Sequence, residues 1–417
     1  MPTALALLAF AAALGLAGHR AGKDFAVPGR AGPDLIGMRD FRDAVYYPAL
    51  AFRKGISPYH AEYVAFHPEG REFPAFSPLT LLVHFPFGLL ELDPSALAFF
   101  CLSAVLVVAF ARLALACCGL PAHADAVLAV AALIVLSRPG QINFYLGQLG
   151  VETALGSMLA LHYAKRRPAI AGLGLAWASI KPNFAVPLAL LMLARRDYRA
   201  VSVGAAAGGL GALVAAAVLV ANYGSPGAFV EGLAERYGSL ASQPAIPPVS
   251  ATESRIDATS LVTRLAGAPP AGPVKLLLFC ACLGVGLAGV GKLRGTSQGE
   301  GADSLSGVLI ALSVLTCIYH QIYDAVLLAV PLLAVAAARN DVWRSLTPAR
   351  RGVLIALLAL PAANYLATTR VFRLLNPPGM TWSAIMSLNA AALLVALATY
   401  GAMALHASRS RCGSVQF

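Results

Sequence analysis

Uninterrupted apolar runs recur along the whole 417-residue chain, and they constrain its fold more than any other feature. Hydrophobic residues make up 58% of the chain and charged residues only 12%, whereas a soluble domain carries roughly 25% charged residues. The runs are continuous and do not alternate with polar residues, which favours helices over the strands of a β-barrel. The sequence therefore predicts an all-α polytopic integral membrane protein, with residues 1–417 as one membrane-embedded domain.

The apolar runs predict about 11–13 transmembrane or re-entrant helices. Several runs are shorter than the ~20 residues of a full crossing, as in broken or re-entrant pairs that line a cavity. The first run lacks a basic segment before it, which favours an uncleaved helix over a signal peptide. The candidate spans are 3–18, 77–92, 95–117, 124–137, 147–163, 168–180, 183–194, 201–222, 274–293, 305–320, 323–338, 352–368 and 381–405.

Basic clusters orient these spans. Clusters at 165–167, 195–199, 291–295 and 338–344 are predicted to be cytoplasmic by the positive-inside rule. The break "IKPN" (180–183) and the segment "YHQIYD" (319–324) then form the outer tips of two hairpins. Each half of the first hairpin is about thirteen residues, or roughly 20 Å of helix.

Two large extracytoplasmic loops follow from this topology, over 19–76 and 223–272. The topology needs an odd number of membrane crossings between residues 77 and 165, but the sequence has four apolar runs there. One of these runs must therefore be re-entrant or interfacial. The 77–92 run contains Pro78 and Pro86 and is the best candidate.

The net charge of +11 is explained by cytoplasmic loops and by membrane lipids as partners, so nucleic acid is not expected. The seven cysteines lie mostly inside apolar runs. They show neither a metal-ligand spacing with histidines nor a loop pair. Neither a metal site nor a cofactor is expected.

Polar side chains gather on the predicted outer face. Asp40 and Asp43 lie in the first loop, where either could cap or begin a helix or take a proton from an acceptor hydroxyl. Lys181 interrupts an apolar run, so it either snorkels to the interface or neutralises a leaving phosphate. Arg255 and Arg370 add cations to this face.

Two further groups have both a structural and a functional reading. His320, Tyr323 and Asp324 fit either an interfacial belt or a ligand site for a phosphate or sugar. Gln148 belongs to the twin "GQ" pairs of "PGQINFYLGQLG", and Glu152 follows one turn later. Buried amides and carboxylates need partners, which could be substrate or one another.

The ordered set of segments resembles glycosyltransferase family 87 of the GT-C superfamily over roughly residues 35–340. The segments are "YYPALAFRKGISPY", "FPAFSPLTLLVHFPFGLL", "LGQLGVETALGSMLALHYAKRRPAIAGLGLAWASIKPNFAVPLALLML" and "YHQIYDAVLLAVP". The resemblance implies a GT-C type helical bundle with a polyprenyl-phosphate sugar donor, usually mannose. A loop-one aspartate would deprotonate a lipid or glycan hydroxyl, which attacks the anomeric carbon with inversion.

The resemblance also implies roles for individual residues. Asp40 opens a "DF" pair and matches the family's base best, but the extra acid in "FRDAVYYP" leaves Asp43 as its rival. Lys181 matches the family's KP lysine, and His320 lies where the family often has a polar cluster. With Arg255 and Arg370 from the same outer face they are the predicted donor-phosphate ligands, and the predicted substrate-binding residues are Tyr59, Gln148, Tyr323 and Asp324. The expected location is a bacterial plasma membrane, with the active site facing outward.

Two other classes of protein would use similar residues. A transporter or flippase of lipid-linked sugars or small solutes also needs intramembrane charges and broken helices. A non-catalytic membrane subunit would tolerate loss of the outer carboxylates. The large outer loops, the one-sided charges and the lack of visible repeats favour the enzyme.

Overall fold

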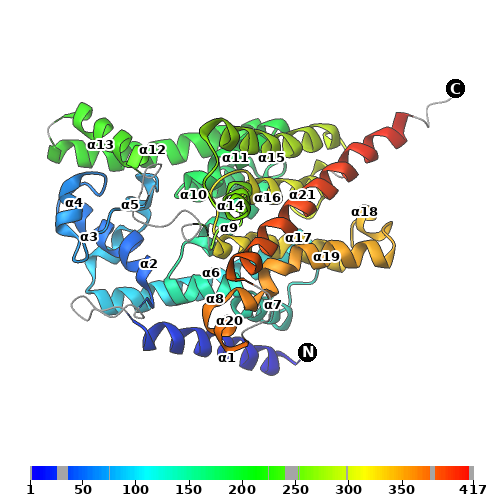
Figure 1. The fold of residues 1–417 in the computed structure, drawn as a ribbon, viewed down its shortest axis with the longest axis horizontal. Helices are drawn as coiled ribbons and strands as arrows, with labels where there is room; N and C mark the ends of the chain where they lie inside the picture. The colour runs from blue at the N-terminus through cyan, green and yellow to red at the C-terminus, as the bar shows by residue number, and fades with distance from the viewer. Residues whose placement is uncertain are drawn as a thin grey trace.

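The computed structural model describes residues 2–25, 36–74, 76–223, 225–239, 252, 254–296, 299–375 and 381–412. Within these ranges the chain forms helices and no strand beyond two isolated β-bridges. The protein is an all-α polytopic membrane protein, as the apolar runs predicted. In Figure 1 the helices α3, α4 and α13 lie at one end of the molecule, and α18 lies toward the other.

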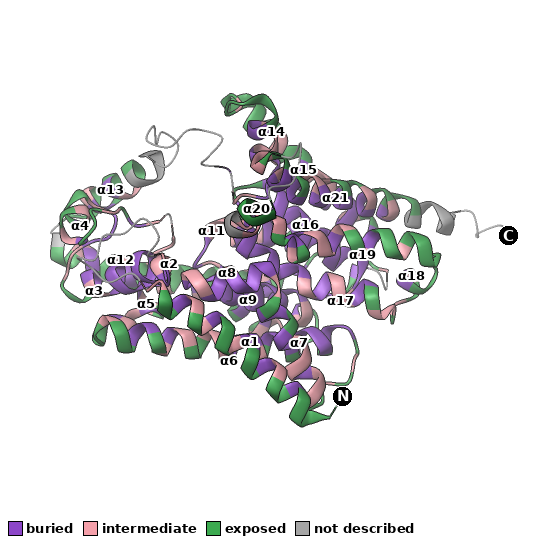
Figure 2. Ribbon diagram, turned by 60° about the horizontal axis from the view of Figure 1, so that its bottom comes forward, coloured by how far each residue is buried: buried purple, intermediate pink, exposed green. Residues whose placement is uncertain are grey.

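Five of the described helices are long and apolar enough to cross a bilayer. They leave much of their surface exposed, which suits contact with lipid, and Figure 2 shows the exposed face of α1 at the outside of the bundle. These helices are α1 (Thr3–Lys23), α6 (Leu92–Cys117), α12 (Tyr198–Tyr223), α15 (Gly272–Leu293) and α21 (Trp382–Cys412).

Shorter helices fill the centre of the bundle. Every residue of α16 is buried, as are most residues of α9 (Figure 2). The shorter helices are α7 (Ala124–Leu136), α8 (Arg138–Leu146), α9 (Gly150–Tyr163), α10 (Pro168–Ala178), α11 (Pro182–Ala194), α16 (Leu305–Cys317), α17 (Ala329–Ala337) and α19 (Pro348–Ala363). Glycine lets two of them approach closely, because a Cβ on Gly156 of α9 would lie 2.7 Å from the carbonyl oxygen of Gly174 in α10.

Proline and capping residues explain where the predicted runs break. Helix α8 begins at Arg138 after the Ser137 cap, with Pro139 in its first turn, and the axis bends by 75° between α7 and α8. The expected span 124–137 is therefore half of a broken element. The predicted break at "IKPN" is confirmed, because α10 ends at Ala178 and α11 begins at Pro182.

The run 77–92 does not form a spanning helix, as its prolines suggested. It consists of α5 (Leu79–Val83) and the 3₁₀-helix η2 (Phe85–Leu89). Three elements remain between this run and residue 165, namely α6, the bent pair α7–α8, and α9. These three elements can provide the odd number of membrane crossings that the predicted topology needs before residue 165.

The loop regions contain short helices and are not irregular coil. The first loop holds α2 (Arg39–Phe41), the π-helix η1 (Arg42–Tyr46), α3 (Tyr47–Arg53) and α4 (Ala61–Phe66). Its aromatic residues form a small core of their own, in which the Phe41 ring lies 4.9 Å from Phe99 and 5.9 Å from Phe87. This core anchors the loop to the start of α6.

The remaining described elements complete the bundle. The second predicted loop contains α13 (Pro226–Ser239) and α14 (Ala258–Ala266), while residues 240–251 and 253 lie outside the described part. The late elements are the 3₁₀-helix η5 (Ile322–Leu328), α18 (Asp341–Arg344), η6 (Tyr365–Ala367) and α20 (Thr369–Leu375).

Candidate active site

A left-handed turn brings the first loop against the end of α8. Met38 has φ 53°, and its backbone N–H donates to the carbonyl oxygen of Tyr145 at 2.7 Å. The chain then enters α2, so that Asp40 lies beside the connection between α8 and α9. Asp40 follows the first span in the sequence, but in the structure this turn places it against the middle of the bundle.

Gly147 makes this approach possible. It ends α8 with φ 70°, a conformation that favours glycine, and an added Cβ would lie 2.4 Å from the Cβ of Phe41. The turn therefore brings the next residue, Gln148, onto the loop. The Gln148 side-chain amide donates a hydrogen bond to Oδ2 of Asp40 and also contacts the Tyr323 hydroxyl.

The environment of Asp40 makes it a stronger base than an ordinary aspartate. Burial raises the pKa of Asp40 from 3.8 to about 6; the Gln148 hydrogen bond opposes this rise, and the Asp43 charge adds to it. Its side chain keeps part of its surface accessible. At neutral pH this carboxylate is ionised, and it can accept a proton near the working pH.

Asp43 lies in a different environment although it is only three residues away. Its carboxylate contacts Arg42 at 3.1 Å, Arg71 at 3.0 Å and His67 Nε2 at 3.4 Å. Burial alone would raise the pKa of Asp43, but the contacts with His67, Arg71 and Arg42 lower it below its usual value. Asp43 therefore acts as the hub of an ion-pair cluster that ties the loop together.

Lys181 is the N-cap residue of α11 and is almost completely buried, with 2% of its surface exposed. Its ammonium lies 3.0 Å from Oδ1 of Asp324. The same nitrogen faces the Tyr323 ring at 4.6 Å and the Phe76 ring at 5.7 Å. The lysine does not snorkel outward, because a carboxylate and aromatic faces hold it inside the protein.

Asp324 joins Lys181 to the turn before η5. Its Oδ2 lies 3.1 Å from Nδ1 of His320 and also accepts the backbone N–H of Gln321 at 3.1 Å. The His320 ring packs edge-on against Phe184 at 4.5 Å, and within the described residues its Nε2 has no hydrogen-bond partner. The predicted cluster at "YHQIYD" is thus joined to the tip of the α10–α11 hairpin.

Three other candidates lie around this centre. Arg255 forms two 2.8 Å bonds with Asp257 and covers the Tyr319 ring at 4.7 Å, beside the β-bridge to Gln321. The buried Tyr59 donates its hydroxyl to the carbonyl oxygen of Phe76 at 2.9 Å. Arg370 belongs to α20, but its side chain lies outside the described part of the structure.

A buried trio was missed by reading the sequence. Nε2 of His84 lies 3.3 Å from Glu152, and the Trp177 indole N–H donates to the same carboxylate at 3.3 Å. The trio links the η2 segment to α9 and α10, one turn below Gln148. Glu152 was noticed as a carboxylate in need of a partner, and the rarity of histidine inside an apolar run could have pointed to His84.

One arrangement thus joins a partly accessible carboxylate to an amide, a tyrosine, a buried lysine and a histidine–aspartate pair. The model of glycosyltransferase family 87 matches residues 75–315, more than half of the chain. The chain belongs to glycosyltransferase family 87. The matched region of this family 87 protein includes Gln148, Lys181 and Arg255, whereas Asp40 lies well before it and His320 shortly after it. No curated protein and no solved structure matches the chain.

Family membership and the helical architecture together make the protein a membrane glycosyltransferase, which moves a sugar from a donor to an acceptor.

Proposed function

We propose that this family 87 protein transfers mannose from a polyprenyl-phosphate donor to a hydroxyl group of a lipid or glycan, on the extracytoplasmic face of a bacterial plasma membrane. The observation that supports this most is the placement of Asp40. It is a carboxylate of raised pKa, hydrogen-bonded to Gln148, beside a centre that contains Lys181. A base and a cation on one side suit one-sided transfer chemistry better than alternating access.

Asp40 is assigned the role of general base. The acceptor oxygen attacks the anomeric carbon as Asp40 takes its proton, and the bond from that carbon to the phosphate oxygen breaks. The displaced polyprenyl phosphate carries away the bonding electrons, and the anomeric configuration inverts. Asp43 fits this role poorly because Arg42, Arg71 and His67 already contact its carboxylate.

Lys181 is assigned to the leaving phosphate, with Asp324 as the residue that positions it. A buried ammonium aimed at developing negative charge stabilises a transition state strongly. The phosphate would share Lys181 with Asp324, while His320 holds the other oxygen of that carboxylate. Gln148 and Tyr323 are assigned to the sugar, because they lie between Asp40 and Lys181.

The test is transfer of radiolabelled mannose from polyprenyl-phosphate mannose to membrane lipid or glycan extracts by the purified full chain. Asp40→Asn should lower the rate by about 10²–10⁴-fold, the usual contribution of a general base. Asp43→Asn is the matched control, and its rate per folded molecule should fall much less. Full activity in Asp40→Asn would exclude Asp40 as the base.

The donor is tested separately. Nucleotide-linked mannose should not replace the lipid-linked donor, and efficient use of it would contradict the donor assignment. If no sample transfers sugar while the protein moves lipid-linked sugar across vesicles, the transporter alternative is correct.

A further inference from the structure

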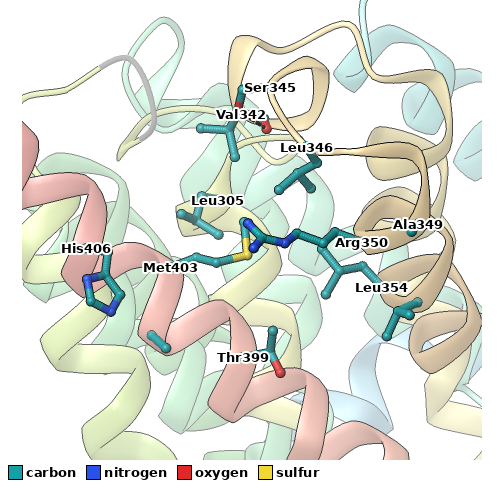
Figure 3. Close-up of a pocket in the computed structure, with 12 residues that line it drawn as sticks. Leu305, Val342, Ser345, Leu346, Ala349, Arg350, Leu354, Thr399, Met403 and His406 are labelled. Atoms are coloured by element: carbon teal, nitrogen blue, oxygen red, sulfur yellow. Dashed lines mark hydrogen bonds between the residues drawn. The ribbon is translucent and has the colours of Figure 1, made fainter.

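A groove of about 840 Å³ lies between the first residue of α16, α18, α19 and α21. Its floor and walls are formed by apolar side chains, including Leu305, Leu346, Leu354 and Met403 (Figure 3). A groove of this size is within the range that holds a small organic ligand or part of a lipid. It lies near α18, whereas α2, the helix that contains Asp40, lies toward the other end of the molecule (Figure 1).

Among the described residues that line the groove, Arg350 carries a formal charge, and this charge is positive. Arg350 extends from α19 toward Met403 of α21, and His406 lies farther along α21 (Figure 3). Among the described residues that line the groove there is no acid, and Arg350 has no ion-pair partner in the part of the chain that the structure describes. The first turn of the 16-residue α19 also contains no acid, so its positive dipole end adds to the Arg350 charge.

A neighbouring cavity provides a contrast. It lies at the same end of the bundle, but acids are interspersed with its cations, and Arg344 is paired with Asp341 there. The helices α6 and α9 also end in it, and their C-termini disfavour anions. The neighbouring cavity therefore has acids and cations side by side, whereas the α19–α21 groove has an arginine without a nearby acid above an apolar floor.

The groove opens on the outside of the bundle, since Val353 at its edge is 59% exposed. In a polytopic membrane protein such a surface meets lipid. The basic segment 338–344 precedes α19, so the positive-inside rule places Arg350 at the head-group level of the cytoplasmic leaflet. Basic pockets between membrane helices on this side suit anionic lipid head groups.

We propose that the α19–α21 groove binds an anionic glycerophospholipid of the inner leaflet. Its phosphate contacts Arg350, and one acyl chain lies against Leu354 and Met403. Because the groove is near the opposite end of the molecule from Asp40, this lipid is a bound structural ligand and not the sugar donor. The proposal does not depend on which donor the enzyme uses.

The test uses the purified full chain in detergent, with phosphatidylglycerol and phosphatidylcholine added separately and the bound lipid counted by native mass spectrometry. Wild type should prefer phosphatidylglycerol. Arg350→Gln should weaken phosphatidylglycerol binding about fivefold, the factor expected for one interfacial arginine. Arg351→Gln is the matched control, because the adjacent arginine on α19 does not line the groove.

A second variant tests the apolar half of the site. Ala402 lines the groove at an exposed position, so Ala402→Phe fills it without crowding the core. It should lower binding of phosphatidylglycerol by a similar factor while Arg350 remains. Equal losses in Arg350→Gln and Arg351→Gln, or unchanged binding in Ala402→Phe, would overturn the proposal. Displacement of phosphatidylglycerol by an equal concentration of polyprenyl phosphate would instead make the carrier lipid the occupant.

Discussion

Replacing Asp40 by asparagine should stabilise the protein in neutral solution while it lowers the transfer rate by about 10²–10⁴-fold. Burial raises the pKa of Asp40 from 3.8 to about 6, so the folded state disfavours the ionised form. At 1.36 kcal/mol per pKa unit this difference is roughly 3 kcal/mol, and solvent near the partly accessible side chain reduces it, so that about 1–3 kcal/mol is expected. Asparagine has nearly the same shape and can still bond to Gln148.

The pH dependence of this stabilisation follows from its sign. Below pH 3.8 Asp40 is protonated in both folded and unfolded chains, so the substitution should change little. The destabilisation by Asp40 grows as pH rises and is complete above about 6. Thermal unfolding of wild type and Asp40→Asn in the same detergent at pH 4 and pH 8 measures it. A lower midpoint for Asp40→Asn at pH 8, or the same gain at both pH values, would refute the reasoning.

Other predictions concern the surrounding residues. Asp43→Asn should lower the free energy of unfolding by about 1–3 kcal/mol, because it removes one carboxylate from the cluster and leaves Arg42 and Arg71 to share Glu69; its lowered pKa means that this loss should shrink as pH falls through the acid range in the same unfolding assay. The wild-type transfer rate should rise about tenfold between pH 5 and a plateau above pH 7 as Asp40 ionises; a flat initial-rate profile would argue against this base. Gly147→Ala should reduce transfer more than about tenfold, because a left-handed alanine costs ~1–2 kcal/mol and its Cβ displaces the first loop; unchanged steady-state kinetics would contradict the close approach. Lys181→Met or Asp324→Leu alone should destabilise by about 3–5 kcal/mol, and the double variant by less, in a double-mutant cycle of unfolding; additive losses would show that the pair is not coupled.

The helical architecture and several of its breaks could be predicted from the sequence, because continuous apolar runs and prolines act locally. The proline-rich run 77–92 and the break before Pro182 are examples. The difference between Asp40 and Asp43 could not be predicted in this way. It depends on the π-helix Arg42–Tyr46, which contains Asp43 and follows Asp40, and on partners such as Arg71 that approach only after the loop has folded.

The contacts between the first loop, the α8–α9 connection and the two hairpin tips were only partly predictable from the sequence. The topology placed Lys181 and Asp324 on one face, but their 3.0 Å contact depends on how the two hairpin tips pack. The contact between Gln148 and Asp40 depends on the left-handed Gly147, whose role as a close-approach residue becomes visible only beside Phe41. The bend between α7 and α8, which places Gln148 there, has a sequence signal in Ser137 and Pro139 that apolar periodicity alone does not reveal.

The buried contacts of Glu152 also bear on how the chain is made. The helix α9 has only 14 residues and contains this carboxylate, so on its own it is a poor substrate for insertion into a bilayer. Of its two partners, His84 is synthesised before α9 and Trp177 after it. The ribosome must therefore deliver α10 before the carboxylate is fully satisfied. We infer that α9 and α10 enter the membrane together as a helical hairpin, against an α6 that is already in place.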